Sequence, residues 1–532
     1  MKDRKYPAMK GIATRRIIPV MAVVAALLMV SVALAATTTE TLVSPSATRF
    51  PKNKQNESPM AVNPLDASNA ISGANDEIEE PDCTPETGGS SNCPFDPNTN
   101  TTGVYVTTNG GANWSQQILD WSSADLVSDG DPVVAFGPQP DGDGGFSYDN
   151  GARAYFASLA GSPNYGPNQE LLAVSYSDNK GMTWSAPVVA TTRDNPVNFN
   201  DKVAIWADAN PDSPYFGNVY VSWTLFTGNF PPPSFVREGP VFLPSPIMIA
   251  RSTDGGLTFG KPRQLTPAHN NGAVGGRQGS TIRTAPNGDV YVFWEDGYQR
   301  QSAILSARST DGGASFGRPF LVSFISDVPP AFPGASFRTN SFPMADIDAD
   351  GNLYVVWPDY TDGHAVVKLA KSTNGGAAWD VSTAGDVTGR SAFYPAVAVA
   401  GSHVFIGFNA IDDVPEDTKP GAGVVFYDAY YVFSSDGGDS FGAPVKISAA
   451  SSDPDVATAN SLTAQFVGDY NGAAASPDGS FWFSWTDTRN GATCAAVDDW
   501  RASGFETTKP NIYDSCDPAF GNSDIYVAHV TP

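Results

Sequence analysis

The chain has 532 residues, with 31 Lys plus Arg against 56 Asp plus Glu, and its formal net charge at pH 7 is −25. A surface this acidic repels phosphate backbones and anionic lipids, so we expect neither nucleic acid nor a membrane surface as a partner. The four His and four Cys lack zinc-ligand spacing, which argues against a zinc site.

The first 35 residues have the pattern of a secretory signal peptide. A basic segment precedes a long apolar run, and Ala33-Leu34-Ala35 supplies a small-residue cleavage site. We therefore expect cleavage after Ala35, leaving residues 36–532 as a single secreted domain that does not contact the membrane. An uncleaved N-terminal anchor is the alternative, because the run is nearly long enough to span a bilayer.

The four cysteines are Cys83, Cys93, Cys494 and Cys516. An even number of cysteines in an exported chain indicates disulfides, here two, with three pairings open. We expect Cys83–Cys93 and Cys494–Cys516, because these pairs close the shortest loops.

One eight-residue string recurs six times between residues 107 and 441, for example STDGGLTF from Ser252 and SSDGGDSF from Ser434. Ser and Asp or Asn side chains bond to turn backbone, and Gly accepts positive φ, so the string predicts a β-hairpin turn. We expect its closing aromatic residues to be buried at equivalent positions: Trp114, Trp184, Phe259, Phe316, Trp379 and Phe441.

A second pattern alternates with the first. It is an extended segment, an Asp/Asn-Gly turn and a β-rich strand that often ends in Trp-x-Asp, as in GDVYVFWED ending at Asp296. Seven such units predict an all-β β-propeller of four-stranded antiparallel blades. Seven blades are expected, and six are the alternative if the first unit is an extension. The last unit lacks a fourth strand, and the N-terminal segment around residues 40–47 is expected to supply it and close the ring.

The recurring string resembles the Asp box, or bacterial neuraminidase repeat, of sialidases and related propellers. The resemblance covers nearly all of residues 36–532 and implies a secreted, sialidase-like glycoside hydrolase whose partner is a glycan or glycoconjugate. Asp boxes also occur in propellers without this activity, so a non-catalytic propeller that binds glycan or protein is the alternative. The family's F/Y-R-I-P motif is not found before the first string.

The longest insertions fall between the second and third strands of the expected blades, and therefore on one face of the ring. Residues that begin an innermost strand or end a second strand converge on the channel mouth at that face. Sialoside cleavage uses Arg side chains for the sugar carboxylate, a Tyr nucleophile and a carboxylic acid. We therefore predict substrate binding by Arg277, Arg338, Arg489 and Tyr394, and catalysis by Tyr470, Asp469, Glu295 and Asp201. The competing interpretation is that these Arg and Asp residues brace the blades.

No cofactor is expected. The string Asp346-Ile-Asp348-Ala-Asp350-Gly351 looks like the opening of a calcium loop, but Trp357 stands where such a loop needs its bidentate Glu. A structural turn is the favoured interpretation and calcium is the alternative. The sequence makes no prediction of oligomeric state.

Overall fold

The computed structural model of the protein describes residues 37–44, 49–85, 91–93, 96–162, 170–191, 198–227, 245–267, 277–299 and 301–532. Residues 37–532 form one compact unit. The expected signal peptide and its cleavage site lie outside the described residues. Within the described ranges, no helix is long and apolar enough to cross a membrane.

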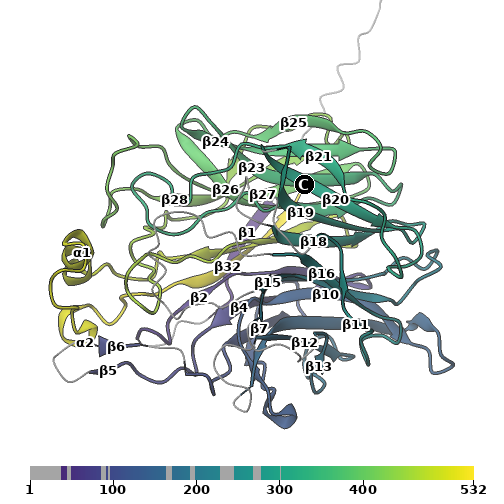
Figure 1. Ribbon diagram of the computed structural model, residues 1–532, viewed down its shortest axis with the longest axis horizontal. Coiled ribbons are helices and arrows are strands. Elements are labelled where there is room, and N and C mark those ends of the chain that lie inside the picture. The colour runs from purple at the N-terminus through teal and green to yellow at the C-terminus, as the bar shows by residue number, and fades with distance from the viewer. Residues whose placement is uncertain are drawn as a thin grey trace, which may run out of the picture. The chain divides into compact units, whose positions relative to one another are not determined.

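The described chain folds into seven four-stranded antiparallel blades of a β-propeller, as expected (Figure 1). In the first six blades the four main strands follow the chain from the innermost to the outermost, so the polypeptide turns back at alternate faces. Blades 1 and 2 carry one short additional strand each. Blade 1 contains β2 (Gln55–Asn56), β3 (Met60–Asn63), β4 (Asp66–Asp76), β7 (Thr102–Thr107) and β8 (Ser115–Ile118). Blade 2 contains β9 (Val127–Ser128), β10 (Val133–Pro140), β11 (Phe146–Gly161), β12 (Leu171–Ser177) and β13 (Val188–Val189).

The next four blades each have four strands. Blade 3 contains β14 (Asn198–Ala207), β15 (Val219–Thr227), β16 (Ile247–Ser252) and β17 (Arg263–Gln264). Blade 4 contains β18 (Gln278–Thr284), β19 (Val290–Tyr298), β20 (Gln301–Ser309) and β21 (Phe320–Phe324). Blade 5 contains β22 (Met344–Ile347), β23 (Leu353–Thr361), β24 (His364–Ser372) and β25 (Asp380–Gly385). Blade 6 contains β26 (Arg390–Ala400), β27 (His403–Asp412), β28 (Tyr427–Ser434) and β29 (Val445–Lys446).

Blade 7 joins the two ends of the described chain. It contains β30 (Gly472–Ala475), β31 (Phe481–Asp487), β32 (Asp524–Thr531) and, as its outermost strand, β1 (Thr37–Leu42). The antiparallel register runs from Thr37 opposite Thr531 to Leu42 opposite Tyr526. The predicted ring closure by an N-terminal strand is therefore confirmed, with the strand beginning slightly earlier than the segment we expected.

Each recurring string forms the turn between the third and fourth strands of one of the first six blades. In blade 3, the Ser252 hydroxyl donates to Asp254 Oδ1 at 2.7 Å, and the Gly256 N–H donates to Ser252 Oγ at 2.8 Å. Blade 3 also contacts the corresponding turn of blade 4, because Arg251 Nη1 donates to the carbonyl of Gly312 at 2.7 Å. The closing aromatic residues pack against the cores between blades, but they are half-buried rather than buried as predicted, because each lies at the outer margin of its blade.

The cores between blades contain fully buried tryptophans on the second strands, among them Trp223, Trp294, Trp357 and Trp485. The last three each donate their indole N–H to the Asp two residues later, at 3.0–3.1 Å. The Asp346–Gly351 string forms the β22–β23 connection, where Asp348 accepts bonds from the N–H groups of Asp350 and Asn352.

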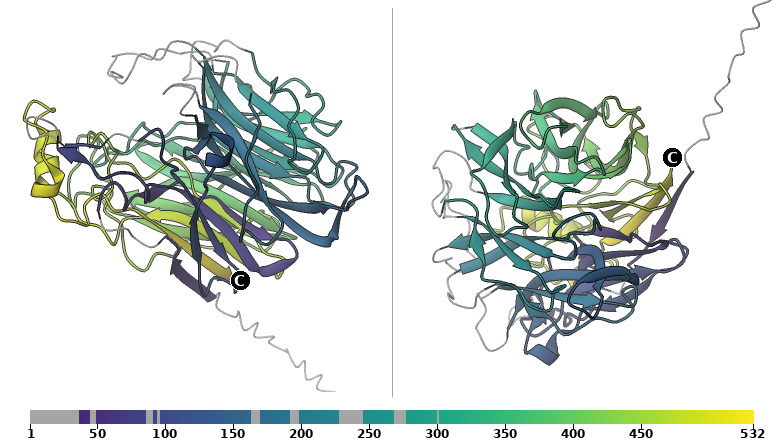
Figure 2. Two further views of the ribbon diagram at one scale, coloured as in Figure 1. Left: turned by 90° about the horizontal axis from the view of Figure 1, so that it is seen from below. Right: turned by 90° about the vertical axis from the view of Figure 1, so that its right-hand side faces the viewer.

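Both predicted disulfides, Cys83–Cys93 and Cys494–Cys516, are present. The loops that they close belong to blades 1 and 7 and pack together in one small apolar cluster that includes Phe50, Leu462 and Trp500. The short strands β5 (Thr84–Pro85) and β6 (Ser91–Asn92) lie beside the helices α1 (Ala495–Ala502) and α2 (Ile512–Ser515) in both figures (Figures 1 and 2). The apolar cluster around the two disulfides thus joins the first blade to the last one. Elsewhere in the chain, a 3-10 turn, η1, spans Ser122–Ala124.

Candidate functional site at the channel mouth

A ring of left-handed backbone surrounds one mouth of the central channel. Glu57, Asp131, Lys202, Gly279 and Tyr394 lie just before or within the innermost strands of blades 1, 2, 3, 4 and 6, and their φ angles lie between 48° and 69°. In blades 3, 4 and 6 this position coincides with a register shift, so the residue forms a β-bulge. A bulge re-aims a side chain, and a non-glycine residue in this conformation costs about 1–3 kcal/mol. Strain of this kind at four non-glycine residues marks the mouth as the candidate site.

Carboxyl groups from adjacent blades meet at this ring. The Lys202 N–H lies 2.8 Å from Asp201 Oδ1 and 3.0 Å from Asp131 Oδ2, so it donates between the two carboxyls. Gln278 Nε2 donates to the other oxygen of Asp201 at 3.1 Å. Burial, followed by the charges of Asp131 and Asp469, raises the pKa of Asp201 to about 8. Asp201 therefore keeps a proton at neutral pH.

Glu57 is the most buried carboxyl of the group, with 1% of its surface exposed. Neither of its carboxyl oxygens has a hydrogen-bond partner among the described residues, and the nearest cation is Arg338 Nη2 at 4.0 Å. Burial and the neighbouring carboxyls of Asp131 and Asp469 raise its pKa well above the usual value. Glu57 is thus a second carboxyl that favours the protonated form.

Lys202 and Tyr470 form the floor of the mouth. The Lys202 ammonium lies 3.6 Å from the centre of the Tyr470 ring, and both residues are buried. Burial lowers the pKa of Lys202, although the carboxyls around it act in the opposite direction. The Tyr470 hydroxyl donates to the Pro132 carbonyl at 2.8 Å, and burial raises its pKa. Tyr470 therefore holds the Lys202 side chain and links blade 7 to blade 2.

Arg338 is the exposed cation of the mouth, with 62% of its side chain accessible to solvent. Its Nε donates to Asp469 Oδ1 at 2.7 Å, its Nη2 contacts Asp469 Oδ2, and the guanidinium lies over the Phe466 ring. The Tyr394 hydroxyl lies 2.6 Å from the Arg338 carbonyl and 2.7 Å from the Gly468 carbonyl. The predicted residues Arg338, Asp469 and Tyr394 are thus brought together.

The other two predicted arginines pair within their own blades. Arg277 Nε donates to Asp296 at 2.9 Å, and both side chains are buried in blade 4. Arg489 binds Asp487 at 2.9 Å and Glu40, on the outermost strand of blade 7, at 2.6 Å. These contacts match the brace that the sequence left open as the competing interpretation.

Glu295, predicted as catalytic, lies opposite Gln278 in the β18–β19 register. Burial, followed by the charge of Asp327, raises its pKa to about 8, and its Oε2 has no hydrogen-bond partner in the described part of the chain. Gln278 in turn donates to Asp201, so Gln278 connects Glu295 to the carboxyls of the mouth.

Below the mouth, the innermost strands line a cavity of about 340 Å³ along the channel. Lys202 and Tyr470 also border a hollow of about 10 Å³ next to Asp469. Over the described residues, no group of three or more His, Cys, Asp and Glu is arranged to hold a metal ion.

Two important residues of the mouth, Glu57 and Lys202, were not among the predicted catalytic or binding residues. Their position at the start of an innermost strand was the only signal in the sequence. The left-handed backbone conformation that orients their side chains could not be recognised in the sequence, because four of the five residues that adopt it at the mouth are not glycine.

Comparison with known structures finds matches at low sequence identity. A protein of unknown function from Dyadobacter fermentans aligns over 75% of this chain and 93% of its own, with 13% identity and a TM-score of 0.42. The intramolecular trans-sialidase of Ruminococcus gnavus aligns over 73% of this chain and 96% of its own, with 12% identity and a TM-score of 0.40. The NanB sialidase of Streptococcus pneumoniae aligns over 73% of this chain and 70% of its own, with 11% identity and a TM-score of 0.41.

No protein-family model matches the sequence, and no curated protein matches it. Likeness at this level of identity concerns the fold alone. Function is therefore argued from the residues of the mouth.

Proposed function

We propose that the channel mouth is the active site of a glycoside hydrolase that acts on an acidic glycan. Glycosidic bond cleavage needs one carboxyl that carries a proton and a second that is ionised. The observation that supports the proposal is the difference between two carboxyls at the mouth. The pKa of Asp201 is raised to about 8, whereas Asp469 forms an ion pair with Arg338.

In this proposal Asp201 gives its proton to the leaving oxygen, and Asp469 stabilises positive charge at the sugar or activates water. Arg338 is the exposed cation that meets an acidic group of the substrate. The Lys202 N–H donates to both Asp201 and Asp131, and the charge of Asp131 adds to burial in raising the pKa of Asp201.

The contacts of Tyr470 favour carboxyl chemistry over the tyrosine nucleophile suggested by the sialidase resemblance. A nucleophilic phenol needs a lowered pKa and a nearby base. The Tyr470 hydroxyl instead donates to a backbone carbonyl, and its pKa is raised. We therefore assign Tyr470 a positioning role.

Binding without hydrolysis is the second candidate. It is supported by the ion pairs of Arg277 and Arg489, which leave Arg338 as the one predicted arginine largely exposed to solvent. We also infer that the protein is secreted, because two disulfides are typical of exported proteins.

The test is hydrolysis of a panel of fluorogenic glycosides, including a sialoside and a uronide, by the wild-type protein and two variants. Asp201→Asn removes the proposed acid, and we expect at least about 100-fold lower activity. Asp417→Asn, an exposed carboxyl in the loop after β27, is the matched control and is expected to be neutral. Binding of an acidic sugar without turnover of any glycoside would favour the second candidate.

A further inference from the structure

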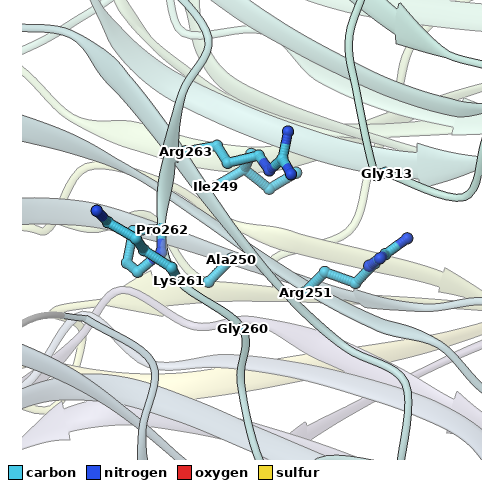
Figure 3. Close-up of a pocket in the computed structure, with 8 residues that line it drawn as sticks. All are labelled: Ile249, Ala250, Arg251, Gly260, Lys261, Pro262, Arg263 and Gly313. Atoms are coloured by element: carbon cyan, nitrogen blue, oxygen red, sulfur yellow. The ribbon is translucent and has the colours of Figure 1, made fainter.

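The outer part of blade 3 contains a positively charged groove that lies apart from the channel mouth. Its volume is about 350 Å³, and it lies between β16 and the segment that leads into β17. Ala250, Gly260 and Gly313 form a floor almost without side chains, and Arg251, Lys261 and Arg263 supply the charge. The Lys261 and Arg251 side chains extend toward opposite ends of the groove, with Arg263 between them (Figure 3).

Two of these cations have side chains without any partner among the described residues. Most described Lys and Arg side chains of this acidic protein form ion pairs, but the side chains of Lys261 and Arg263 make no ion pair or hydrogen bond to any described residue, and both are exposed. Arg251 bonds to the Gly312 carbonyl. The nearby Asp254 carboxylate is bonded within its own turn to Ser252 and Thr258. The positive charge of the groove is therefore available to a ligand.

The six repeats provide an internal comparison for this groove. The four residues after the closing aromatic are SQQI, SAPV, GKPR, GRPF, DVST and GAPV in blades 1 to 6. The fourth position holds an uncharged residue in every blade except blade 3, where it is Arg263. The hairpin geometry requires no cation at this position, so the fold does not explain Arg263.

The groove lies on the face opposite the candidate site. The third strand of each blade runs away from the mouth, and Arg251 stands at its far end, beside the recurring turns. A ligand in the groove is therefore a different one, or a distant part of the same one.

We propose that this groove binds an acidic polysaccharide through sulfate or carboxylate groups carried on successive sugars. Three cations spread along a groove match several anionic groups on an extended chain better than a single small anion. A nucleic acid fits less well, because its longer phosphate footprint would meet the surrounding negative surface. The proposal does not depend on hydrolysis at the mouth.

The test is binding of the full chain to heparin, polygalacturonate, uncharged dextran and duplex DNA at about 50 and 200 mM salt. The variant Lys261→Ala/Arg263→Val changes GKPR to GAPV, the string that blade 6 already folds with, so we expect an unchanged melting temperature. Arg318→Ala is the matched control, because this exposed cation holds the position of Lys261 in blade 4.

We expect wild type to bind heparin or polygalacturonate, and the polymer bound identifies sulfate or carboxylate as the recognised group. The double variant should bind about tenfold more weakly, and Arg318→Ala within about twofold of wild type. Equal binding by the double variant, failure to bind both acidic polysaccharides, equal binding to dextran, or tighter binding to DNA would each overturn the proposal.

Discussion

Arg338, which precedes blade 5, donates its Nε hydrogen to Asp469 Oδ1 of the segment before blade 7 at 2.7 Å, across the channel mouth. The two residues belong to blades that are not neighbours, so the pair spans the entrance rather than one seam. The arginine is mostly exposed and its partner is mostly buried. Burial opposes the charge of Arg338, but the carboxyls of Asp469 and Glu57 raise its pKa above the usual value, so it stays a cation.

Replacing Arg338 with Ala should weaken binding of an acidic sugar about tenfold. It should lower the melting temperature less than Arg277→Ala does, because Arg338 is mostly exposed whereas Arg277 is buried. Arg338→Lys should not restore binding, since Lys lacks the planar pair of donors. Calorimetric titration with the sugar, beside melting curves, separates the two effects. Lys419→Ala, at an exposed lysine, is the control. Unchanged affinity in Arg338→Ala would remove Arg338 from the site.

Replacing Arg277 with Ala should have the opposite profile. It leaves Asp296 buried without its cation, and breaking a buried ion pair destabilises a protein by about 3–5 kcal/mol. We expect a clearly lower unfolding midpoint in denaturant and unchanged affinity for an acidic sugar. A stable variant with lost affinity would show that Arg277 meets ligand after all.

Lys202→Gly tests the strained ring at the mouth. Blade 4 has glycine at the equivalent position, Gly279, so the backbone accepts the change. Relief of the left-handed conformation and removal of a buried cation should keep or raise the melting temperature, whereas activity should fall. Gly279 itself is unsuitable for the reverse change, because an added Cβ would lie 2.4 Å from the Phe342 ring. A variant that melts early and remains active would contradict a functional role for Lys202.

The stability of the blade 5–6 seam should depend on pH through His364. Its ring nitrogens lie 2.8 Å from Asp413 and 3.1 Å from Asp386. Burial opposes protonation, but hydrogen bonds to Asp413 and Asp386 raise its pKa. A raised pKa in the folded state means that the contribution is complete below about pH 6.5 and is lost as pH rises through the folded value. The difference in melting temperature between wild type and His364→Gln should therefore shrink from pH 5 to pH 9, and a constant difference would rule out this coupling.

The disulfide cluster should protect the loops of blades 1 and 7 more than the ring. Cys494→Ala/Cys516→Ala opens the larger loop and removes about 3 kcal/mol of constraint on the unfolded chain. Hydrogen exchange should accelerate in α1 and in the Cys83 loop, with which it shares an apolar core, while β26 and β27 stay protected. Loss of protection throughout the ring would show that the cluster is required for closure.

The fold could be predicted from the sequence because each blade repeats the same local chemistry. The Gly-containing turn strings and the Trp-x-Asp strand ends identify the strands, and the missing fourth strand of blade 7 predicts closure by β1. The half-burial of residues such as Phe259 could not be predicted, because it depends on how far each outer strand extends past its neighbour.

The candidate site could be predicted only in part. The strand pattern predicted which residues lie near the start of each innermost strand, and the structure brings Asp201, Arg338, Tyr394 and Asp469 to one mouth. The strand pattern did not reveal which arginines pair within a blade, since that depends on side-chain direction at the bulges. The same limit applies to Glu57, whose isolation from donors is a property of packing.

The proposed hydrolysis requires Asp201 as a proton donor at the channel mouth, and the most direct test is the pH dependence of glycoside hydrolysis. A group with a pKa of about 8 stays protonated below that pH, so activity should decline as pH rises through about 8. Asp201→Asn should abolish this activity, and Asp417→Asn should keep both the rate and the profile. The stability of the wild-type protein should also fall as pH rises from about 4 to about 8, because a raised carboxyl pKa destabilises the folded state over that range. Asp201→Asn should lack this fall in stability. An Asp201→Asn protein with the wild-type rate and pH profile would contradict the account.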